Sequence, residues 1–325
     1  MGAGEINDMK EPRIQEKKVS RRYEIGHTAM LVLTAMIWGV AFVSQSVGAE
    51  YVGTFTFQAL RNWLGVMVLV PFILVSDRIM LKKTGKNHKP ATRQEKGILL
   101  LAGFLCGVLL FVASSLQQAG IAYTTTAKAG FITTLYVIIV PILSLIGGKK
   151  PELKLWICVL FSLSGLYLLC ISGGLHDLNR GDVLIFISAF AYALQIMTVS
   201  RFISQVDGVR LSLLQLFTTG AISTVLMVFM EKPSLQSIQA AAVPILYAGV
   251  MSSGIAYTLQ IVGQKGLNPT VASIAMCLES VFSAIGGWII LGQTLTVREI
   301  LGCTLMFASI LISQIPVSFR KRKEL

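Results

Sequence analysis

Charged residues are scarce in this sequence. Asp, Glu, Lys and Arg make up 14% of the 325 residues, whereas 54% are apolar, and the mean hydropathy is +0.71. Soluble domains carry about 25% charged residues, so this composition excludes an ordinary water-soluble fold. The net charge of +12 does not indicate a nucleic-acid partner, because basic loops also orient membrane proteins.

Cysteine and histidine are also rare, and their positions argue against metal and redox chemistry. The five cysteines all lie inside apolar runs without CxxC or Cys/His spacing, so we expect small core residues. The three histidines, His27, His88 and His176, fall outside the central parts of those runs. Phosphate-binding loops, dinucleotide-binding turns and the GxSxG motif are absent. The sequence therefore predicts no metal, no cofactor and no enzyme.

The abundant feature is apolar runs of membrane-spanning length. A helix needs about 20 apolar residues to cross a bilayer, and ten runs are of about this length. We therefore expect an all-α membrane protein with ten transmembrane helices. The predicted spans are 26–48, 54–76, 97–118, 124–147, 153–172, 181–201, 209–230, 240–262, 268–291 and 296–317.

The basic residues are distributed unevenly between the loops. If the N-terminus is cytoplasmic, 23 of the 28 Lys and Arg residues fall on the cytoplasmic side and 3 on the other. This asymmetry predicts a multi-pass protein of the cell (plasma) membrane, the inner membrane in a bacterium, with both termini cytoplasmic. Residues 1–24 are predicted to form a cytoplasmic tail that lacks a cleavable signal. Residues 318–325 form a second, basic tail.

The second half of the sequence resembles the first half. The matched segments are 116–120 with 259–263 and Leu135 with Leu278, both at an offset of 143, and 35–38 with 189–192. Five spans per half is an odd number, so the two halves must cross the membrane in opposite orientations. We therefore expect two inverted five-helix repeats, at 25–172 and 181–317.

Glu279 is the strongest candidate for a functional residue. It falls in the middle of a predicted span, where a charge costs several kcal/mol unless it faces protein or water. Its helical neighbours, among them Ala272 and Ser283, are small, which admits either a tightly packed helix or an aqueous cavity. Glu279 could pair with a cation, carry a coupling proton or hold helices together.

Two basic residues also lie within spans. Arg61 shares one polar helical face with Thr54 and Gln58 near the outer leaflet. It either contacts substrate or another charge in a central cavity, or is structural, reaching the headgroups or bonding loop carbonyls. Lys128 lies about one turn into its span, so we expect a structural or gating role rather than direct substrate binding.

Uncharged polar and aromatic residues in the spans are weaker candidates. We expect most of the glutamines to form hydrogen bonds between helices. The second-rank candidates for lining a site are Trp38, Gln118, Tyr192 and Tyr257, followed by Gln45, Gln117, Gln195 and Gln260.

Three stretches resemble the drug/metabolite transporter superfamily, EamA type, and the resemblance covers residues 25–317. They are Ile-Trp-Gly-Val-Ala-Phe at 37–42, Ala-Lys-Ala-Gly-Phe at 127–131 with its continuation to Pro141, and Ala-Tyr-Thr-Leu-Gln at 256–260 with its continuation to Gly292. The chain has Ser280 where that family usually has proline, and Gln293 where it usually has glutamate. The resemblance implies a central site between two repeats, lined by spans 1, 3, 4, 6, 8 and 9. It also implies secondary transport, often export of amino acids or related metabolites.

We therefore predict a secondary transporter of small metabolites that works by alternating access, with the two repeats rocking around a midplane cavity. Glu279 would be a central anchor or coupling site, and Arg61 and Lys128 would shape the extracellular half. The expected partners are a small-molecule substrate and membrane lipid, with no nucleic acid; coupling protons and a homo-oligomer are left open.

Two other functions fit the sequence less well. A proton-coupled multidrug efflux pump for hydrophobic cations would use Glu279 as a shared proton and drug site. A membrane-embedded enzyme acting on lipids would need clustered acid, base or metal ligands, and the sequence offers none.

Overall fold

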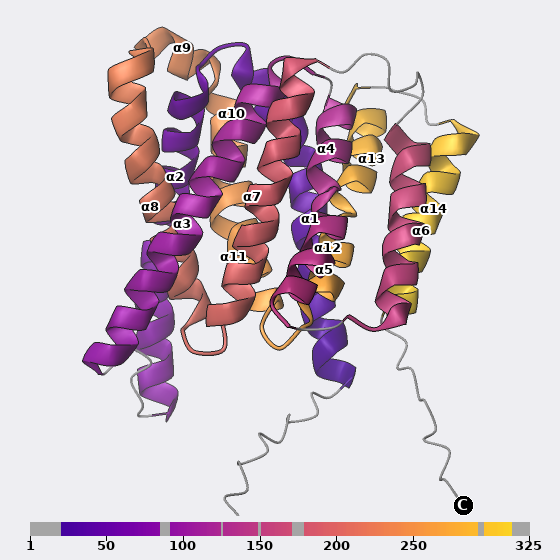
Figure 1. Ribbon diagram of the computed structural model, residues 1–325. Coiled ribbons are helices and arrows are strands. Elements are labelled where there is room, and N and C mark those ends of the chain that lie inside the picture. The colour runs from indigo at the N-terminus through magenta and orange to yellow at the C-terminus, as the bar shows by residue number, and fades with distance from the viewer. Residues whose placement is uncertain are drawn as a thin grey trace, which may run out of the picture.

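The apolar runs fold into helices, because a backbone in lipid must satisfy its hydrogen bonds internally. The computed structural model describes residues 21–84, 92–124, 126–148, 151–170, 179–291 and 296–313, and every regular element in these ranges is helical (Figure 1). The elements are α1 (Arg21–Ala49), α2 (Thr54–Thr84), α3 (Arg93–Ile121), α4 (Thr126–Thr134), α5 (Tyr136–Ile146), α6 (Leu153–Cys170), α7 (Arg180–Phe202), α8 (Gly208–Leu226), the π-helical η1 (Met227–Glu231), α9 (Leu235–Ala240), α10 (Ala242–Tyr247), the π-helical η2 (Ala248–Ala256), α11 (Tyr257–Gly263), α12 (Pro269–Met276), α13 (Glu279–Leu291) and α14 (Val297–Ser313).

These helices confirm the predicted all-α membrane fold. Eight helical stretches of the described chain are long and apolar enough to cross a bilayer, and α6 and α14 contain two shorter apolar stretches. The main difference from the predicted spans is α2, which continues past residue 76 to Thr84 and carries Lys82 and Lys83 in its last turn. Basic residues are favourable there because the C-terminal end of a helix carries partial negative charge.

Two of the spans are broken near their middle. The first break, at Leu135, separates α4 from α5, and the second, at Cys277 and Leu278, separates α12 from α13. Leu135 and Leu278 are the pair matched by the repeat offset of 143 residues. Broken helices are tolerated in a membrane where they line a protein cavity, and they often form the substrate site of inverted-repeat transporters.

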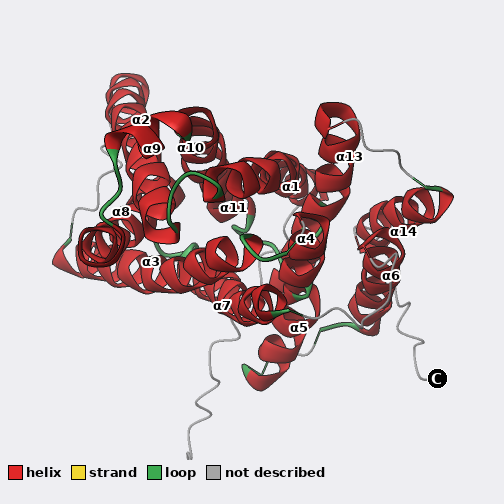
Figure 2. Ribbon diagram, turned by 90° about the horizontal axis from the view of Figure 1, so that it is seen from above, coloured by secondary structure: helices red, strands yellow, loops and turns green. Residues whose placement is uncertain are grey.

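The bundle has two ends that can be told apart by the chain path. In Figure 1, α1 begins and α14 ends at the lower end, which we call the near end; the opposite one is the far end. The assignment of the near end to the cytoplasm stays a prediction. Seen along the bundle, α6 and α14 form a pair at one side, whereas α1, α4, α7 and α11 lie toward the middle (Figure 2). The Oγ atoms of Ser162 and Ser309, 2.7 Å apart, join that outlying pair.

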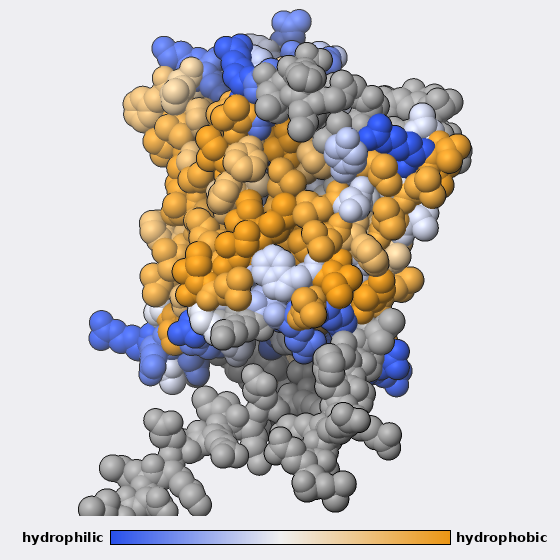
Figure 3. Space-filling model, turned by 45° about the vertical axis from the view of Figure 1, so that its right-hand side comes forward, coloured by the Kyte–Doolittle hydropathy of each residue, from blue (hydrophilic) through white to orange (hydrophobic). Residues whose placement is uncertain are grey.

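The surface carries a broad apolar band between two polar ends (Figure 3). Many large apolar side chains are exposed on the described chain, including Ile146, Phe229 and Val243, each more than three-quarters exposed. A monomer in water rarely exposes a continuous apolar surface of this extent. The protein is therefore a multi-pass membrane protein.

Close helix contacts bring the two halves together near the centre. A Cβ atom at Gly39 of α1 would lie 2.6 Å from Phe282 Cβ and 2.7 Å from Ser283 N of α13. Only glycine permits this approach, as is common where membrane helices pack closely. The contact places Trp38, the residue before Gly39, close to the broken span that begins again at Glu279.

Candidate functional site

A small cavity lies inside the bundle, and both halves of the chain line it. Five of its lining side chains are aromatic: Trp38, Phe42, Tyr136, Tyr192 and Tyr257. Four are uncharged and polar: Gln45, Gln117, Thr133 and Ser252. The remaining two carry opposite charges, Arg61 from α2 and Glu279 from α13. Aromatic walls with a few convergent polar groups are typical of small-molecule sites.

The cavity is small. The volume open to water-sized molecules is about 30 Å³, which is room for about two waters. Sites that hold a drug-sized ligand occupy roughly 300–1,000 Å³. A metabolite can therefore enter only after helices or side chains around the cavity have moved.

The two helix breaks meet at this cavity. Tyr136 is the first residue of α5 and Glu279 the first residue of α13, and Tyr136 Oη donates a hydrogen bond of 3.1 Å to Glu279 Oε1. Glu279 is only 4% exposed. Glu279 lies in the first turn of α13, where the helix dipole favours a negative charge. A phenol O–H adds a hydrogen bond to that charge.

Arg61 enters the cavity from the other side. It is 2% exposed and is the largest fully buried side chain in the described residues. Its Nε donates to Ser253 Oγ at 3.0 Å and its Nη2 to Ser252 Oγ at 2.9 Å, both on η2. Its guanidinium carbon lies 5.9 Å from the centre of the Tyr257 ring, within cation–π range. Arg61 therefore faces the protein interior, and its structural alternative of reaching the headgroups is wrong.

The remaining polar groups form a hydrogen-bonded wall. Tyr192 Oη donates to Gln117 Oε1 at 3.1 Å, and Gln117 Nε2 donates to Thr133 Oγ1 at 3.0 Å. Trp38 Nε1 donates to the Ser252 carbonyl at 3.4 Å. These bonds orient the aromatic side chains, whose faces then define the shape of the cavity.

The two charges remain available to a ligand. Arg61 and Glu279 form no ion pair with each other or with another side chain in the ranges that the structure describes. A buried charge without an opposite partner is costly. The cavity therefore presents one guanidinium and one carboxyl group, neither of them ion-paired within the described residues, to whatever enters it.

The family model for EamA-like transporters matches this chain twice, at residues 27–171 and 179–314. The chain belongs to the EamA-like transporter family.

Several relatives of this EamA-family chain are named as transporters. An uncharacterized transporter of Archaeoglobus fulgidus is 25% identical over 88% of this chain and 85% of its own length. The uncharacterized transporter YoaV of Bacillus subtilis is 21% identical over 90% and 97%. A WAT1-related protein of Arabidopsis thaliana is 25% identical over 87% and 80%. A crystal structure with 16% identity superposes with a TM-score of 0.70 over 89% of this chain and 96% of that one, which shows the fold alone.

Five of the seven predicted site residues line the cavity of this EamA-family protein. They are Trp38, Arg61, Tyr192, Tyr257 and Glu279. Gln118 does not line it; its Nε2 donates instead to the Gln45 carbonyl at 3.0 Å. Lys128 belongs to α4, but its side chain lies outside the described residues. Gln195 and Gln260 form a separate hydrogen bond of 3.0 Å, as expected of glutamines between helices.

Four lining residues were not among the predicted candidates: Phe42, Thr133, Tyr136 and Ser252. Tyr136 could have been found, because it lies 143 residues before Glu279, the offset of the repeat. Ser252 gives no such signal, since it acts through a π-helical segment that the hydropathy pattern does not reveal. In the part of the chain that the structure describes, no three His, Cys, Asp or Glu side chains are placed to hold a metal ion.

Proposed function

We propose that this EamA-family protein exports a small zwitterionic metabolite, an amino acid or a related compound, by alternating access across the cell membrane. The observation that carries this proposal is that a guanidinium, from Arg61, and a carboxyl group, from Glu279, line one small cavity. The carboxylate and the ammonium group of the substrate would supply the ion-pair partners that Arg61 and Glu279 lack among the described residues.

The positions of the lining residues predict how the substrate is oriented in the cavity. A carboxylate suits Arg61, because guanidinium forms short, often bidentate hydrogen bonds with it. An ammonium group suits Glu279 and the aromatic faces beside it, through charge and cation–π contacts. The substrate would therefore lie with its carboxylate toward α2 and its ammonium toward α13.

The small volume of the cavity supports alternating access. A ligand cannot occupy about 30 Å³, so binding must accompany opening to one side of the membrane and closure from the other. Export and the cell-membrane location rest on the family resemblance and on the basic residues assigned to the cytoplasm. We assign the protein no catalytic step.

A transport assay in proteoliposomes tests the proposal. Purified protein would be preloaded with unlabelled amino acids and supplied with a labelled amino-acid mixture, with neutral sugars and hydrophobic cations as comparison solutes. We expect exchange of one or more amino acids, and about tenfold or greater loss of exchange in Arg61→Met and in Glu279→Gln. Amino-acid exchange that survives both substitutions at the wild-type rate would refute the assignment of this cavity.

Efflux of hydrophobic cations is the second candidate function. Glu279 and the five aromatic rings favour it, because these groups attract a cation with an apolar body. Arg61 opposes it, because a fixed positive charge in the same cavity repels such a ligand. Energy-dependent extrusion of a cationic dye from cells, lost in Glu279→Gln and improved in Arg61→Met, would favour this function over the first.

A further inference from the structure

The helices α2 and α8 are joined at three levels along their length. At the far end, Thr56 bonds Glu231, in the π-helical turn η1 that continues α8; in the middle, Trp63 Nε1 donates to Thr224 Oγ1 at 2.8 Å. At the near end, Asp77 pairs with Arg210. Along α2 the contacts lie at residues 56, 63 and 77, so they are separated by 7 and then 14 residues. Along η1 and α8 they lie at 231, 224 and 210, with the same separations in the opposite direction. Multiples of seven keep contacts on the same helix face, so α2 and α8 form one continuous antiparallel seam.

The contact at the far end is a carboxylate that caps a helix of the other half. Glu231 accepts from Phe55 N at 2.8 Å, Thr56 N at 2.7 Å and Thr56 Oγ1 at 2.7 Å. These N–H groups belong to the first turn of α2. Backbone N–H groups in the first turn of a helix have no carbonyl partner within the helix and carry partial positive charge. Gly53 leaves the space for it, since a Cβ atom there would collide with the Glu231 carboxylate.

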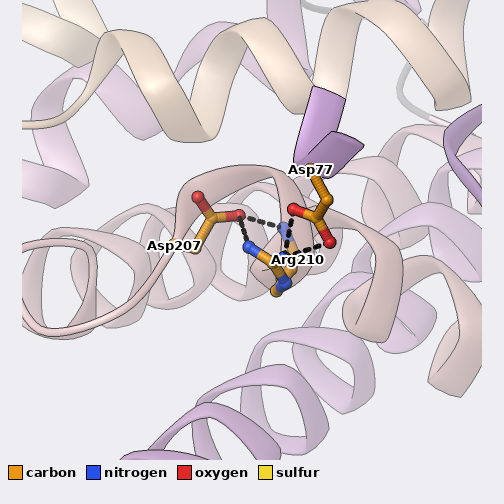
Figure 4. A network of polar contacts seen from close by, with 3 residues as sticks. All are labelled: Asp77, Asp207 and Arg210. Carbon is orange, nitrogen blue, oxygen red and sulfur yellow. Dashed lines mark hydrogen bonds and ion pairs between the residues drawn. The ribbon is translucent and has the colours of Figure 1, made fainter. Parts of the chain in front are cut away.

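At the near end the halves are exchanged, and a carboxylate of α2 binds a side chain in the first turn of α8. Both oxygens of Asp77 accept from Arg210 Nη2, at 2.6 and 2.8 Å. Arg210 lies in the first turn of α8, and its own N–H donates to Asp207 Oδ1 at 2.9 Å (Figure 4). The side chains of Arg210 and Asp77 are only 12% and 15% exposed.

Asp77 and Glu231 occupy equivalent positions in the two halves. They are 154 residues apart, the same offset that matches segment 35–38 with 189–192, and each follows the first residue of α2 or α8 by 23. Each carboxylate holds the first turn of the other half's helix, one at each end of the bundle. We call these two contacts the reciprocal clasps.

From these contacts we infer that α2 and α8 move as a single rigid unit throughout the transport cycle. Opening of the cavity then occurs between this unit and the other lining helices, rather than by rocking of complete halves. The inference rests on the proposed transport function. Because α2 belongs to the first half and α8 to the second, a motion that moved one complete half away from the other would have to pull this unit apart.

The position of the seam supports this assignment. Arg61 is the one residue of the seam helices that lines the cavity, and α8 contributes none of the described lining residues. Separating α2 from α8 would break two charged contacts without opening a path to the substrate. The seam instead fixes the helix that carries Arg61, so Asp77 and Glu231 are positioning residues for the binding site.

Disulfide locks test the inference in a cysteine-free background. Asn62→Cys with Gly220→Cys locks α2 to α8 in the middle of the seam and leaves both clasps intact, because a Cβ atom at Gly220 would lie 3.4 Å from Asn62 Cβ. The matched control, Val68→Cys with Gly254→Cys, ties α2 to η2, which carries the lining residue Ser252; a Cβ atom at Gly254 would lie 3.4 Å from Val68 Cβ. Exchange of the labelled amino-acid mixture is measured before linking, after linking and after reduction.

We expect the seam lock to change exchange by no more than about twofold relative to the same variant before linking, and the control lock to reduce it about tenfold or more, reversibly. Reversible loss of exchange on locking the seam would overturn the inference. Absence of exchange in the unlinked wild type would instead refute the proposed function, so the two failures are distinguishable.

A second measurement leaves the residues of the seam unsubstituted, in case the cysteine pair prevents folding. Spin labels on the exposed positions Leu81 of α2 and Val225 of α8 report the spacing of the two helices by pulsed electron resonance. We expect one narrow distance distribution in nanodiscs, unchanged by saturating amino-acid mixture. A second or shifted distance would show that the seam opens, and would overturn the inference without any change to the clasps.

Discussion

Replacing Arg61 by methionine separates what this residue does for stability from what it does for binding. Methionine keeps the length and apolar stem of the side chain but removes the charge and both hydrogen bonds to η2. The desolvation cost of a buried guanidinium without a carboxylate partner disappears as well. The two serine hydroxyls can bond carbonyls of their own helix. We therefore expect a change in Tm of no more than a few degrees.

Binding should respond much more strongly. Removing one partner of a buried, hydrogen-bonded charge pair costs about 3 kcal/mol, which is about 150-fold in Kd. Arg61→Lys keeps the charge but cannot reach Ser252 and Ser253 at once, so we expect a smaller loss of about tenfold. Trp63→Phe is the matched control, because this residue lies on the same helix, contacts Thr224 of α8 and does not line the cavity.

Pairing the protein variant with a substrate variant isolates the carboxylate contact. The Kd of a transported amino acid and of its methyl ester would be measured by calorimetry for wild type and Arg61→Met. Such a cycle reports the coupling between two groups only when they interact. We expect the variant to weaken the amino acid but to leave the ester within about threefold. Equal losses for both ligands would show that Arg61 shapes the cavity without contacting the carboxylate.

Three further predictions concern the other parts of the site and the seam. Protonation neutralises Glu279 and removes the partner of the substrate ammonium, so substrate affinity should fall as pH decreases. In Glu279→Gln the affinity should be low and independent of pH. A pH dependence retained in this variant would show that another group is responsible for it. Gly53→Ala should lower the unfolding free energy by about 1–2 kcal/mol, because the added methyl group displaces the Glu231 cap; an unchanged Tm would contradict this. Ser280→Pro should leave Tm within a few degrees, because position 280 lies in the first turn of α13, where proline is tolerated; loss of folded protein in size-exclusion chromatography would count against it.

The helices were predictable from the sequence because hydropathy alone decides where a chain can cross lipid. The predicted spans correspond closely to the observed elements, with most boundaries within a few residues. The break at Leu135 was not predictable from composition, since an apolar run continues through it. The sequence also carries no proline at position 280 to mark the second break, and the helix is nevertheless interrupted at Cys277 and Leu278.

The site was predictable where depth in the membrane was the deciding quantity. Glu279 and Arg61 were identified because charges at such depth must face protein or water. Gln118 does not line the cavity, because a polar side chain in a span satisfies its hydrogen bonds as well with a neighbouring helix as with a cavity. Which of the two occurs depends on helix rotation, and α3 turns Gln117 toward the cavity and Gln118 toward the Gln45 carbonyl.

The hydrogen bond between Tyr136 and Glu279 joins two positions separated by the repeat offset, and therefore lies where an axis relating the halves would pass. An assembly of two identical five-helix chains would bring the same side chain face to face with itself at that point. Two glutamates would repel each other, and two tyrosines would bring no charge. Joining the halves in one polypeptide lets a donor stand on one side and an acceptor on the other, so a site with unequal ends can form between two segments that match the same family model.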